Sequence, residues 1–311
     1  EPFIGRHAKE LAFAHRLYDG KMRRYIEVEI YQLAEKYLGG HLNPRNFLSS
    51  PESLPGRFNL AKIKYGHHSR GVFGLNASEL QQHVFIAGRS GSGKTNTAML
   101  LAQELIKHNI PIWVIDFKMA WRTLLSSQNP QSPKISLFTV GRDLAPIYFN
   151  PLIPPANVDW ETCINHLNDL ICHAYFGGEG VSALLQRGFE KLYKRWRSHG
   201  EIPSFLVLKK EIVKLAHNSR EKSWLATTRR ILQRLNFGSF GRAINSDKSS
   251  NLRDLLARYV ILEMENLSES DRAFFTGALL LWIYESLLAR GASKLRLVLF
   301  IEESHHLFSR K

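Results

Sequence analysis

The segment Gly88-Arg89-Ser90-Gly91-Ser92-Gly93-Lys94-Thr95 constrains the fold of this chain more than any other. It fits the pattern G-x-x-x-x-G-K-[ST], in which the backbone of a glycine-rich loop wraps around phosphate groups. The apolar run 83–87 predicts a buried strand before the loop, and the apolar spacing within 96–108 predicts a helix after it. A Gly/Ser-rich hairpin or linker is the alternative, but the order strand, glycine loop, helix favours a phosphate-binding loop.

The residue types of this loop suit the binding of ATP with Mg²⁺. Gly88, Gly91 and Gly93 let the backbone turn tightly around an anion, and the N–H groups of the loop and of the helix N-terminus point at the phosphates. We expect Lys94 to reach the β- and γ-phosphates as a catalytic group, and the Thr95 hydroxyl to ligate Mg²⁺. The predicted nucleotide-binding residues of this region are Gly88, Arg89, Ser90, Gly91, Ser92, Gly93, Lys94, Thr95 and Asn96.

Apolar segments that alternate with helical patterns predict a parallel sheet covered on both faces. The predicted strands are 111–116, 136–140, 259–263 and 295–303, and a long amphipathic helix is predicted over 270–290. Parallel sheets of this kind bind ligands at the carboxyl ends of their strands. Asp116, followed by Lys118, lies at such an end, so Asp116 is predicted either to line the nucleotide site or to cap its strand.

The last predicted strand ends in Glu302-Glu303, which is the expected acidic partner of a phosphate-binding loop. Glu302 would bind Mg²⁺ directly or through water, and Glu303 would orient or polarise the attacking water. The usual residue at the first position is Asp, and the extra methylene of Glu302 can alter the metal geometry. An acidic strand end without a catalytic role is the alternative. His305 and His306 follow, with a γ-phosphate-sensing role and a packing role both open.

The composition favours a polyanionic partner. The 311 residues include 42 Lys+Arg against 28 Asp+Glu, a formal charge of +14, which indicates nucleic acid first, anionic lipid second, or a basic surface of no specific role. Cys163 and Cys172 cannot build a disulfide framework, so we expect a cytoplasmic protein. No apolar run approaches the roughly 20 residues that span a bilayer.

Several of these segments together resemble the HerA/FtsK superfamily, in particular HerA-type DNA translocases and the ATPases of conjugation and type IV secretion. The resemblance covers roughly residues 70–311. Besides the phosphate-binding loop it rests on Val114-Ile115-Asp116, Phe149-Asn150-Pro151-Leu152, the helical segments 229–238 and 280–285, and Ile301-Glu302-Glu303-Ser304-His305-His306-Leu307. A HerA protein would carry a small β-barrel in the first 60 residues, where the apolar spacing here predicts helices.

The predicted fold class is therefore α/β: a RecA-like P-loop NTPase core with a mostly parallel sheet, an all-α insertion and a helical N-terminal region. We expect a helical N-terminal region and linker over 1–60 and the first part of the core over 61–155. The all-α insertion would occupy 156–250, and the second part of the core 251–311.

The resemblance implies a homohexameric ring that translocates double-stranded DNA, with ATP bound between neighbouring subunits and DNA-stimulated hydrolysis. In the family a polar sensor and an arginine finger follow the acidic strand, so we expect the chain to continue beyond Lys311. Arg229, Arg230 and Arg234 are possible substitutes, although their helical spacing is typical of a solvated face.

Three alternatives remain open. The first is an ATPase that energises protein or DNA transfer in type IV secretion or conjugation. The second is an ATPase scaffold in antiviral defence that licenses a partner effector nuclease docked on the N-terminal helices. The third is a nucleotide-binding scaffold that does not hydrolyse ATP because Glu302 weakens the metal site.

Overall fold

The computed structural model describes residues 5–38, 54–65, 68–126, 133–215, 219–247, 251–291 and 294–304. The chain forms two compact units, one ending at Leu75 and the other beginning at Asn76. This division falls at the end of a β-hairpin rather than at the expected boundary after residue 60. Each unit is described by itself below.

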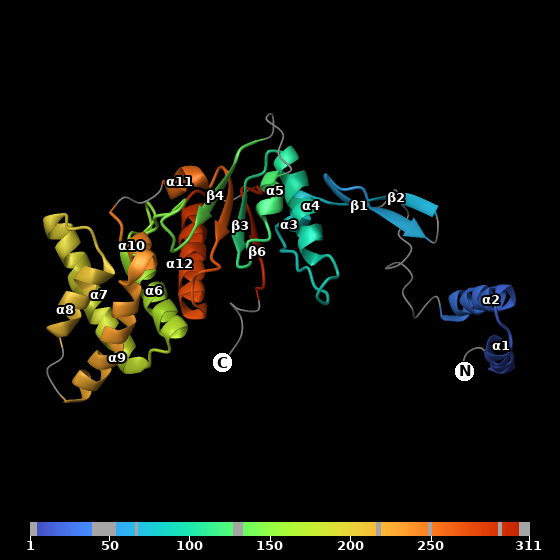
Figure 1. Cartoon of the computed structure of the whole chain (residues 1–311), viewed down its shortest axis with the longest axis horizontal. Coiled ribbons are helices and arrows are strands. Elements are labelled where there is room, and N and C mark those ends of the chain that lie inside the picture. Colours follow the sequence, from blue (N-terminus) through green and yellow to red (C-terminus); the bar gives the residue numbers. More distant parts are fainter. Residues whose placement is uncertain are drawn as a thin grey trace. The chain divides into compact units, whose positions relative to one another are not determined.

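The first unit contains a helical hairpin and a β-hairpin (Figure 1). Helix α1 (Gly5–Leu17) and helix α2 (Lys21–Leu38) are joined through Gly20, whose φ of 68° is the left-handed conformation that glycine adopts readily. Strand β1 (Phe58–Tyr65) pairs antiparallel with strand β2 (His68–Leu75). The N-terminal region is thus helical as predicted, and the β-hairpin follows it.

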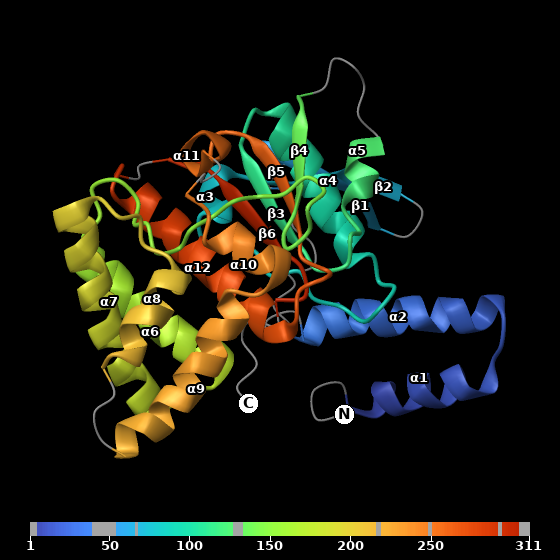
Figure 2. The same cartoon turned by 60° about the vertical axis from the view of Figure 1, so that its left-hand side comes forward.

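The second unit is built on a parallel sheet in the order β4-β5-β3-β6. These strands are β4 (Ile135–Thr139), β5 (Tyr259–Glu263), β3 (Ile112–Asp116) and β6 (Val298–Ile301), and every pair of neighbours is parallel. Helices α4 (Lys94–Lys107) and α5 (Arg122–Ser126) cover one face, and α12 (Glu269–Leu288) covers the other (Figures 1 and 2). The predicted α/β fold class with a parallel sheet is confirmed.

Alternation along β3 explains why the sheet is buried on both faces. Trp113 and Ile115 belong to the large hydrophobic cluster that includes α12, whereas Ile112 and Val114 point to the opposite face, which α4 covers. All five residues of β3 are buried, as expected for a central strand of a parallel sheet. The carboxyl ends of β3, β5 and β6 therefore meet at one edge, where the phosphate-binding loop enters α4.

The predicted all-α insertion is present. It consists of α6 (Trp160–Tyr175), α7 (Glu179–His199), α8 (Phe205–Val213), α9 (Ser219–Leu235) and α10 (Gly238–Ile244). N-caps fix two of these starts, because Asp159 accepts from Thr162 N–H and Ser204 from Val207 N–H. The short helices α3 (Ala77–Leu80) and α11 (Leu252–Leu255) complete the unit. No helix in the described ranges has the length and apolar character needed to cross a membrane.

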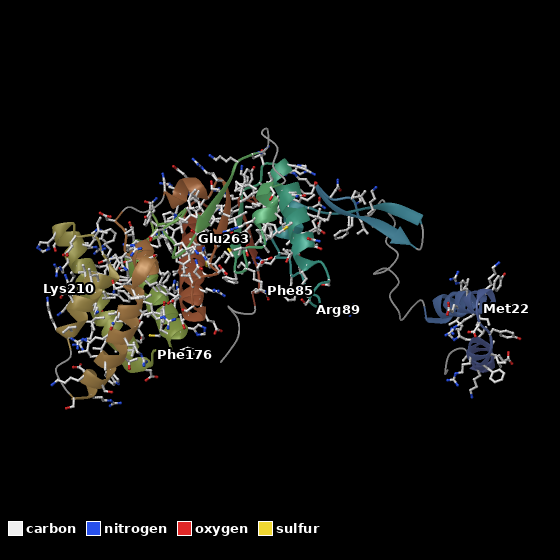
Figure 3. All side chains as sticks on the ribbon, in the orientation of Figure 1. Met22, Phe85, Arg89, Phe176, Lys210 and Glu263 are labelled. Carbon is white, nitrogen blue, oxygen red and sulfur yellow. The ribbon has the colours of Figure 1, made fainter. Side chains whose placement is uncertain are left out.

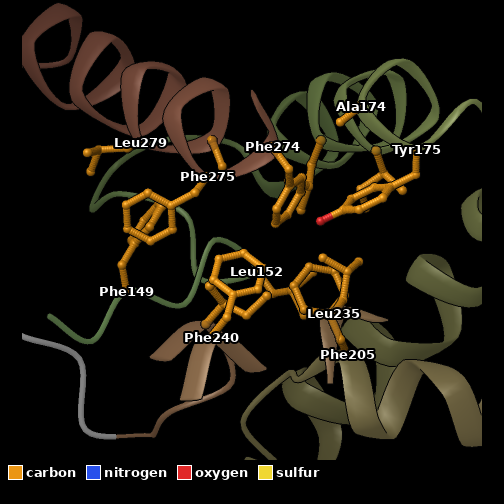
Figure 4. Close-up of a cluster of buried hydrophobic side chains, with 14 of the residues drawn as sticks. Phe149, Leu152, Ala174, Tyr175, Phe205, Leu235, Phe240, Phe274, Phe275 and Leu279 are labelled. Atoms are coloured by element: carbon orange, nitrogen blue, oxygen red, sulfur yellow. The ribbon is translucent and has the colours of Figure 1, made fainter. Parts of the chain in front are cut away.

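Aromatic side chains from the insertion and from the core segment before it pack against α12 (Figure 4). Phe149 meets Phe275 edge to face with ring centroids 5.7 Å apart, and Phe205 meets Phe274 in the same way at 5.9 Å. All four rings are buried. Such pairs add to the stabilisation from burial alone, so this cluster holds the insertion onto the core.

We expect Phe274→Ala to destabilise the protein by about 3–5 kcal/mol, because it removes a fully buried ring and leaves a cavity. Chemical denaturation would show this as a lower midpoint. Leu288→Ala, on an exposed position of the same helix, is the matched control and should change the midpoint little. Equal effects of the two substitutions would contradict the packing described here.

The predicted buried strand over residues 83–87 is wrong. The segment forms no strand, and Val84 and Phe85 are 47% and 84% exposed. Phe85 is labelled in Figure 3. β6 pairs with β3 on one side, and within the described ranges no strand pairs with its other side, so residues 83–87 do not join the sheet at this open edge. An apolar run becomes a buried strand only if it pairs with a neighbour and is covered, and its apolar character alone specifies neither.

Candidate nucleotide-binding site

The glycine loop has the backbone geometry that phosphate binding requires. Gly91 and Gly93 have φ values of 76° and 90°, in the left-handed region that other residues rarely adopt. A Cβ on Gly88 would lie 2.5 Å from Ser92 Oγ, so a side chain at this position would displace the Ser92 hydroxyl. Gly93 is the N-cap of α4. Because glycine has no side chain, no side-chain cap bonds to the first N–H groups of the helix. Loop and helix start thus form an anion cradle that fits a nucleotide phosphate.

Lys94 is the first residue of α4, and its side chain folds back over the loop. Its Nζ donates to the carbonyl oxygens of Gly88 at 3.0 Å and of Arg89 at 3.1 Å. The ammonium therefore lies across the loop, where a phosphate group would meet it. Thr95 and Asn96 follow in the first turn of α4. The structure thus brings all nine predicted loop residues to one helix start.

Asp116 shapes the turn after β3. Its buried carboxylate accepts from Lys118 N–H through Oδ1 and from Trp121 N–H through Oδ2, both at 2.9 Å. This geometry is that of a strand cap, the second of the two roles considered for Asp116. A contact with nucleotide stays a prediction for this residue.

Glu302 continues the β6 ladder, since its N–H donates to Ile115 O at 3.2 Å. Burial raises the pKa of its carboxyl group above the ordinary value, and the charges of Asp116 and Glu303 add to this, whereas Trp121 and Thr95 act as weaker opposing donors. Because Thr95 lowers the pKa of Glu302, the predicted metal-binding hydroxyl and the predicted metal-binding carboxylate lie close together. The donor set of Thr95 and Glu302, both oxygen, suits Mg²⁺.

The indole of Trp121 is buried and lies against Phe300, with ring centroids 5.2 Å apart. Its N–H lies near enough to the Glu302 carboxyl group to lower the pKa of that group, but the contact lacks the geometry of a full hydrogen bond, and the N–H has no other partner among the described residues. A buried donor without a partner is costly, and such groups concentrate at functional sites. Trp121 therefore belongs to the site as a spare donor beside Glu302.

Glu303 adopts a left-handed backbone with a φ of 46°, which is unusual for a residue with a side chain. Its Oε1 accepts a hydrogen bond from the Lys118 ammonium. This contact raises the pKa of Lys118, and the charges of Glu303 and Glu302 act in the same direction. The two predicted acidic residues thus lie at one sheet edge with Lys118, at the end of the neighbouring strand β3.

Sequence reasoning missed the pair of Glu263 and Arg122. Glu263 ends β5 directly beside Asp116 in the parallel register, and it is buried. Arg122 forms a bidentate pair with it, Nε to Oε1 at 2.6 Å and Nη2 to Oε2 at 2.7 Å, and this hydrogen bonding raises the pKa of Arg122. The apolar strand 259–263 that ends in a carboxylate was the available signal for Glu263.

Two further predictions concern residues outside this edge. His305 and His306 lie outside the described residues. Arg234 is engaged within its own unit, because its Nε donates to Asp271 Oδ1 at 3.1 Å and its guanidinium lies 5.7 Å from the centre of the Tyr175 ring. Arg229 and Arg230 are exposed on α9.

Glu302→Gln is expected to raise the melting temperature at pH 7–8 by roughly 2 °C. The folded pKa of Glu302 lies above its unfolded value, so the ionised form costs stability, and that cost disappears as the pH falls through the folded pKa. The gain should therefore vanish on acidification, while the variant loses Mg²⁺-dependent nucleotide binding at neutral pH. Glu190→Gln, on an exposed position of α7, is the control for both measurements. A lower melting temperature for Glu302→Gln would contradict this account.

An α/β unit with a phosphate-binding loop and an acidic strand end at one sheet edge is a P-loop NTPase by fold and by site. The family model for the central domain of the helicase HerA matches residues 63–281, and the chain belongs to this family. No curated protein sequence matches the chain.

Two solved structures are similar to it in fold. VirB4 of Thermoanaerobacter pseudethanolicus matches with a TM-score of 0.54 and 14% identity, over 80% of this chain and 71% of VirB4. The bacterial conjugative coupling protein TrwB matches with a TM-score of 0.49 and 15% identity, over 71% of this chain. The matched region spans 55% of that TrwB chain, and TrwB has also been solved with the ATP analogue ADPNP.

Proposed function

We propose that this protein is a DNA-stimulated ATPase that works as a HerA-type motor on double-stranded DNA, in the cytoplasm and as a homohexameric ring. The observation that carries the proposal is the meeting of Lys94, Thr95, Glu302 and Glu303 at one edge of a parallel sheet. Membership of the HerA family supports the choice of DNA as substrate. The net charge of +14 supports a polyanionic partner.

Each residue of the site has a separate role in the proposed hydrolysis of ATP. Loop N–H groups and the Lys94 ammonium bind and orient the triphosphate, and Thr95 and Glu302 would hold Mg²⁺. The metal supplies charge neutralisation at the phosphates when it is bound. Glu303 orients the attacking water and accepts its proton as the water oxygen bonds to the γ-phosphorus, while the bond from that phosphorus to the bridging oxygen breaks and ADP leaves. An arginine from the neighbouring subunit completes the site.

The proposal predicts ATP turnover that rises when long duplex DNA is added at low salt. Because Lys and Arg contacts to phosphates release counterions, the DNA affinity should fall steeply between 50 and 200 mM salt, by about 10³-fold if six or more phosphates are contacted. A titration of ATPase rate against DNA at several salt concentrations measures this. Turnover that long duplex DNA leaves unchanged would rule out the motor.

A second candidate is an ATPase scaffold that licenses a partner effector nuclease. One observation favours it: α1, α2 and the turn between them expose a set of large apolar side chains, namely Phe13, Leu17, Tyr18, Met22, Tyr25 and Val28. Met22 is labelled in Figure 3. Exposed apolar groups of this kind are typical of interaction surfaces. Charged substitutions at Leu17 and Tyr25 should then abolish effector activity and leave ATP turnover intact.

A further inference from the structure

Lys118 lies beside the acidic end of β6, with its backbone held in place and its side chain largely exposed. Its N–H is tied to Asp116 Oδ1 at 2.9 Å, whereas 64% of its side chain is exposed. The ammonium contacts Glu303 Oε1 and is also attracted by Glu302. The Glu303 side chain is 29% exposed, so this ion pair lies at the rim of the site and not in the core.

Both ammonium groups of the site are bound to groups of the chain itself. Lys94 donates to two loop carbonyls, and Lys118 donates to Glu303. A triphosphate carries several negative charges and is a stronger partner for either cation than a carbonyl or one carboxylate. The Lys118 ammonium occupies one acceptor position on Oε1 and fixes the direction of the carboxylate, so its departure lets the side chain turn toward a water molecule.

We propose that Lys118 is a positioning residue that restrains Glu303 until the terminal phosphate of the nucleotide attracts its ammonium. This inference rests on the proposed function, which gives Glu303 its role towards water. Exposed ion pairs are weak, so the restraint is easily released, and its effect on rate is limited to about two- to fivefold. The left-handed backbone of Glu303 fits a conformation that a contact holds in place.

The contact itself can be tested without turnover, by acylation of lysines and mass spectrometry of the full-length protein in the absence of nucleotide. Glu303→Gln removes the charged partner, so the labelling rate of Lys118 should rise about two- to fivefold over wild type. The matched control is Glu104→Gln, which frees Lys107, paired with Glu104 at 2.5 Å, and should leave Lys118 unchanged. Equal labelling of Lys118 in wild type and Glu303→Gln overturns the proposal.

The consequence for Glu303 is tested by basal ATP turnover without DNA. Lys118→Met should turn over about two- to fivefold faster than wild type, Lys118→Arg should retain the restraint, and Lys107→Met should match wild type. Turnover of Lys118→Met at or below the wild-type rate overturns the proposal. The proposed function fails on a different result, namely ATP turnover that long duplex DNA leaves unchanged, and the labelling experiment does not depend on turnover.

Discussion

Glu303→Gln is expected to lower ATP turnover by about 10²–10⁴-fold, the usual contribution of a general base. The amide keeps the size and shape of the side chain but cannot accept a proton. The loop and Lys94 hold the phosphates independently of Glu303, so Mg²⁺-dependent ATP binding should stay within about threefold of wild type. Single-turnover hydrolysis and equilibrium binding of a fluorescent ATP analogue measure the two effects separately.

The control for this substitution is Glu265→Gln. Glu265 follows β5 at the same edge of the sheet and pairs with Arg142, Nη2 to Oε2 at 3.2 Å. Its loss should leave turnover near wild type. If Glu303→Gln turned over at the wild-type rate, Glu303 would not be the general base. If wild type, Glu303→Gln and Lys94→Ala all gave the same rate, the chain would be a nucleotide-binding scaffold, as the replacement of the usual Asp by Glu302 allows.

Local pattern was sufficient for most of the fold. Periodicity within a few residues predicts the helices of the insertion and the four apolar segments that form β3, β4, β5 and β6. The phosphate-binding loop is likewise a contiguous motif whose glycines meet backbone requirements of their own, as Gly91 and Gly93 show. Such features can be read from a short window of sequence because their causes are local.

The parts that sequence reasoning missed depend on distant partners. The Lys118–Glu303 contact joins residues 185 positions apart, and the Arg122–Glu263 pair joins residues 141 positions apart. Their meeting follows from the strand order, which no local pattern specifies. The failure at residues 83–87 has the same origin, since an apolar run is a strand only if another strand lies beside it. The candidate residues of the site could be named one by one from the sequence, but the ion pairs between them could not be predicted.

Lys94→Ala is expected to weaken ATP binding by about 10–100-fold, because it removes charge-assisted hydrogen bonds to the phosphates. Turnover should fall further than binding, since the same ammonium opposes the negative charge that develops as the γ-phosphate leaves. In the part of the chain that the structure describes, the amine donates to two exposed loop carbonyls, Gly88 O and Arg89 O. The fold should therefore tolerate its loss, with a melting temperature close to wild type.

Lys107→Ala, at the other end of α4, removes an equal charge far from the loop and should leave binding and turnover unchanged. The turnover rates of the Lys94 and Lys118 variants then distinguish the two lysines of the site, because the two substitutions should change turnover in opposite directions. Lys94 acts on the phosphates, so its removal slows turnover, whereas Lys118 acts on Glu303, so its removal speeds basal turnover. If both substitutions slowed turnover equally, both ammonium groups would serve the phosphates, and Glu303 would need no release.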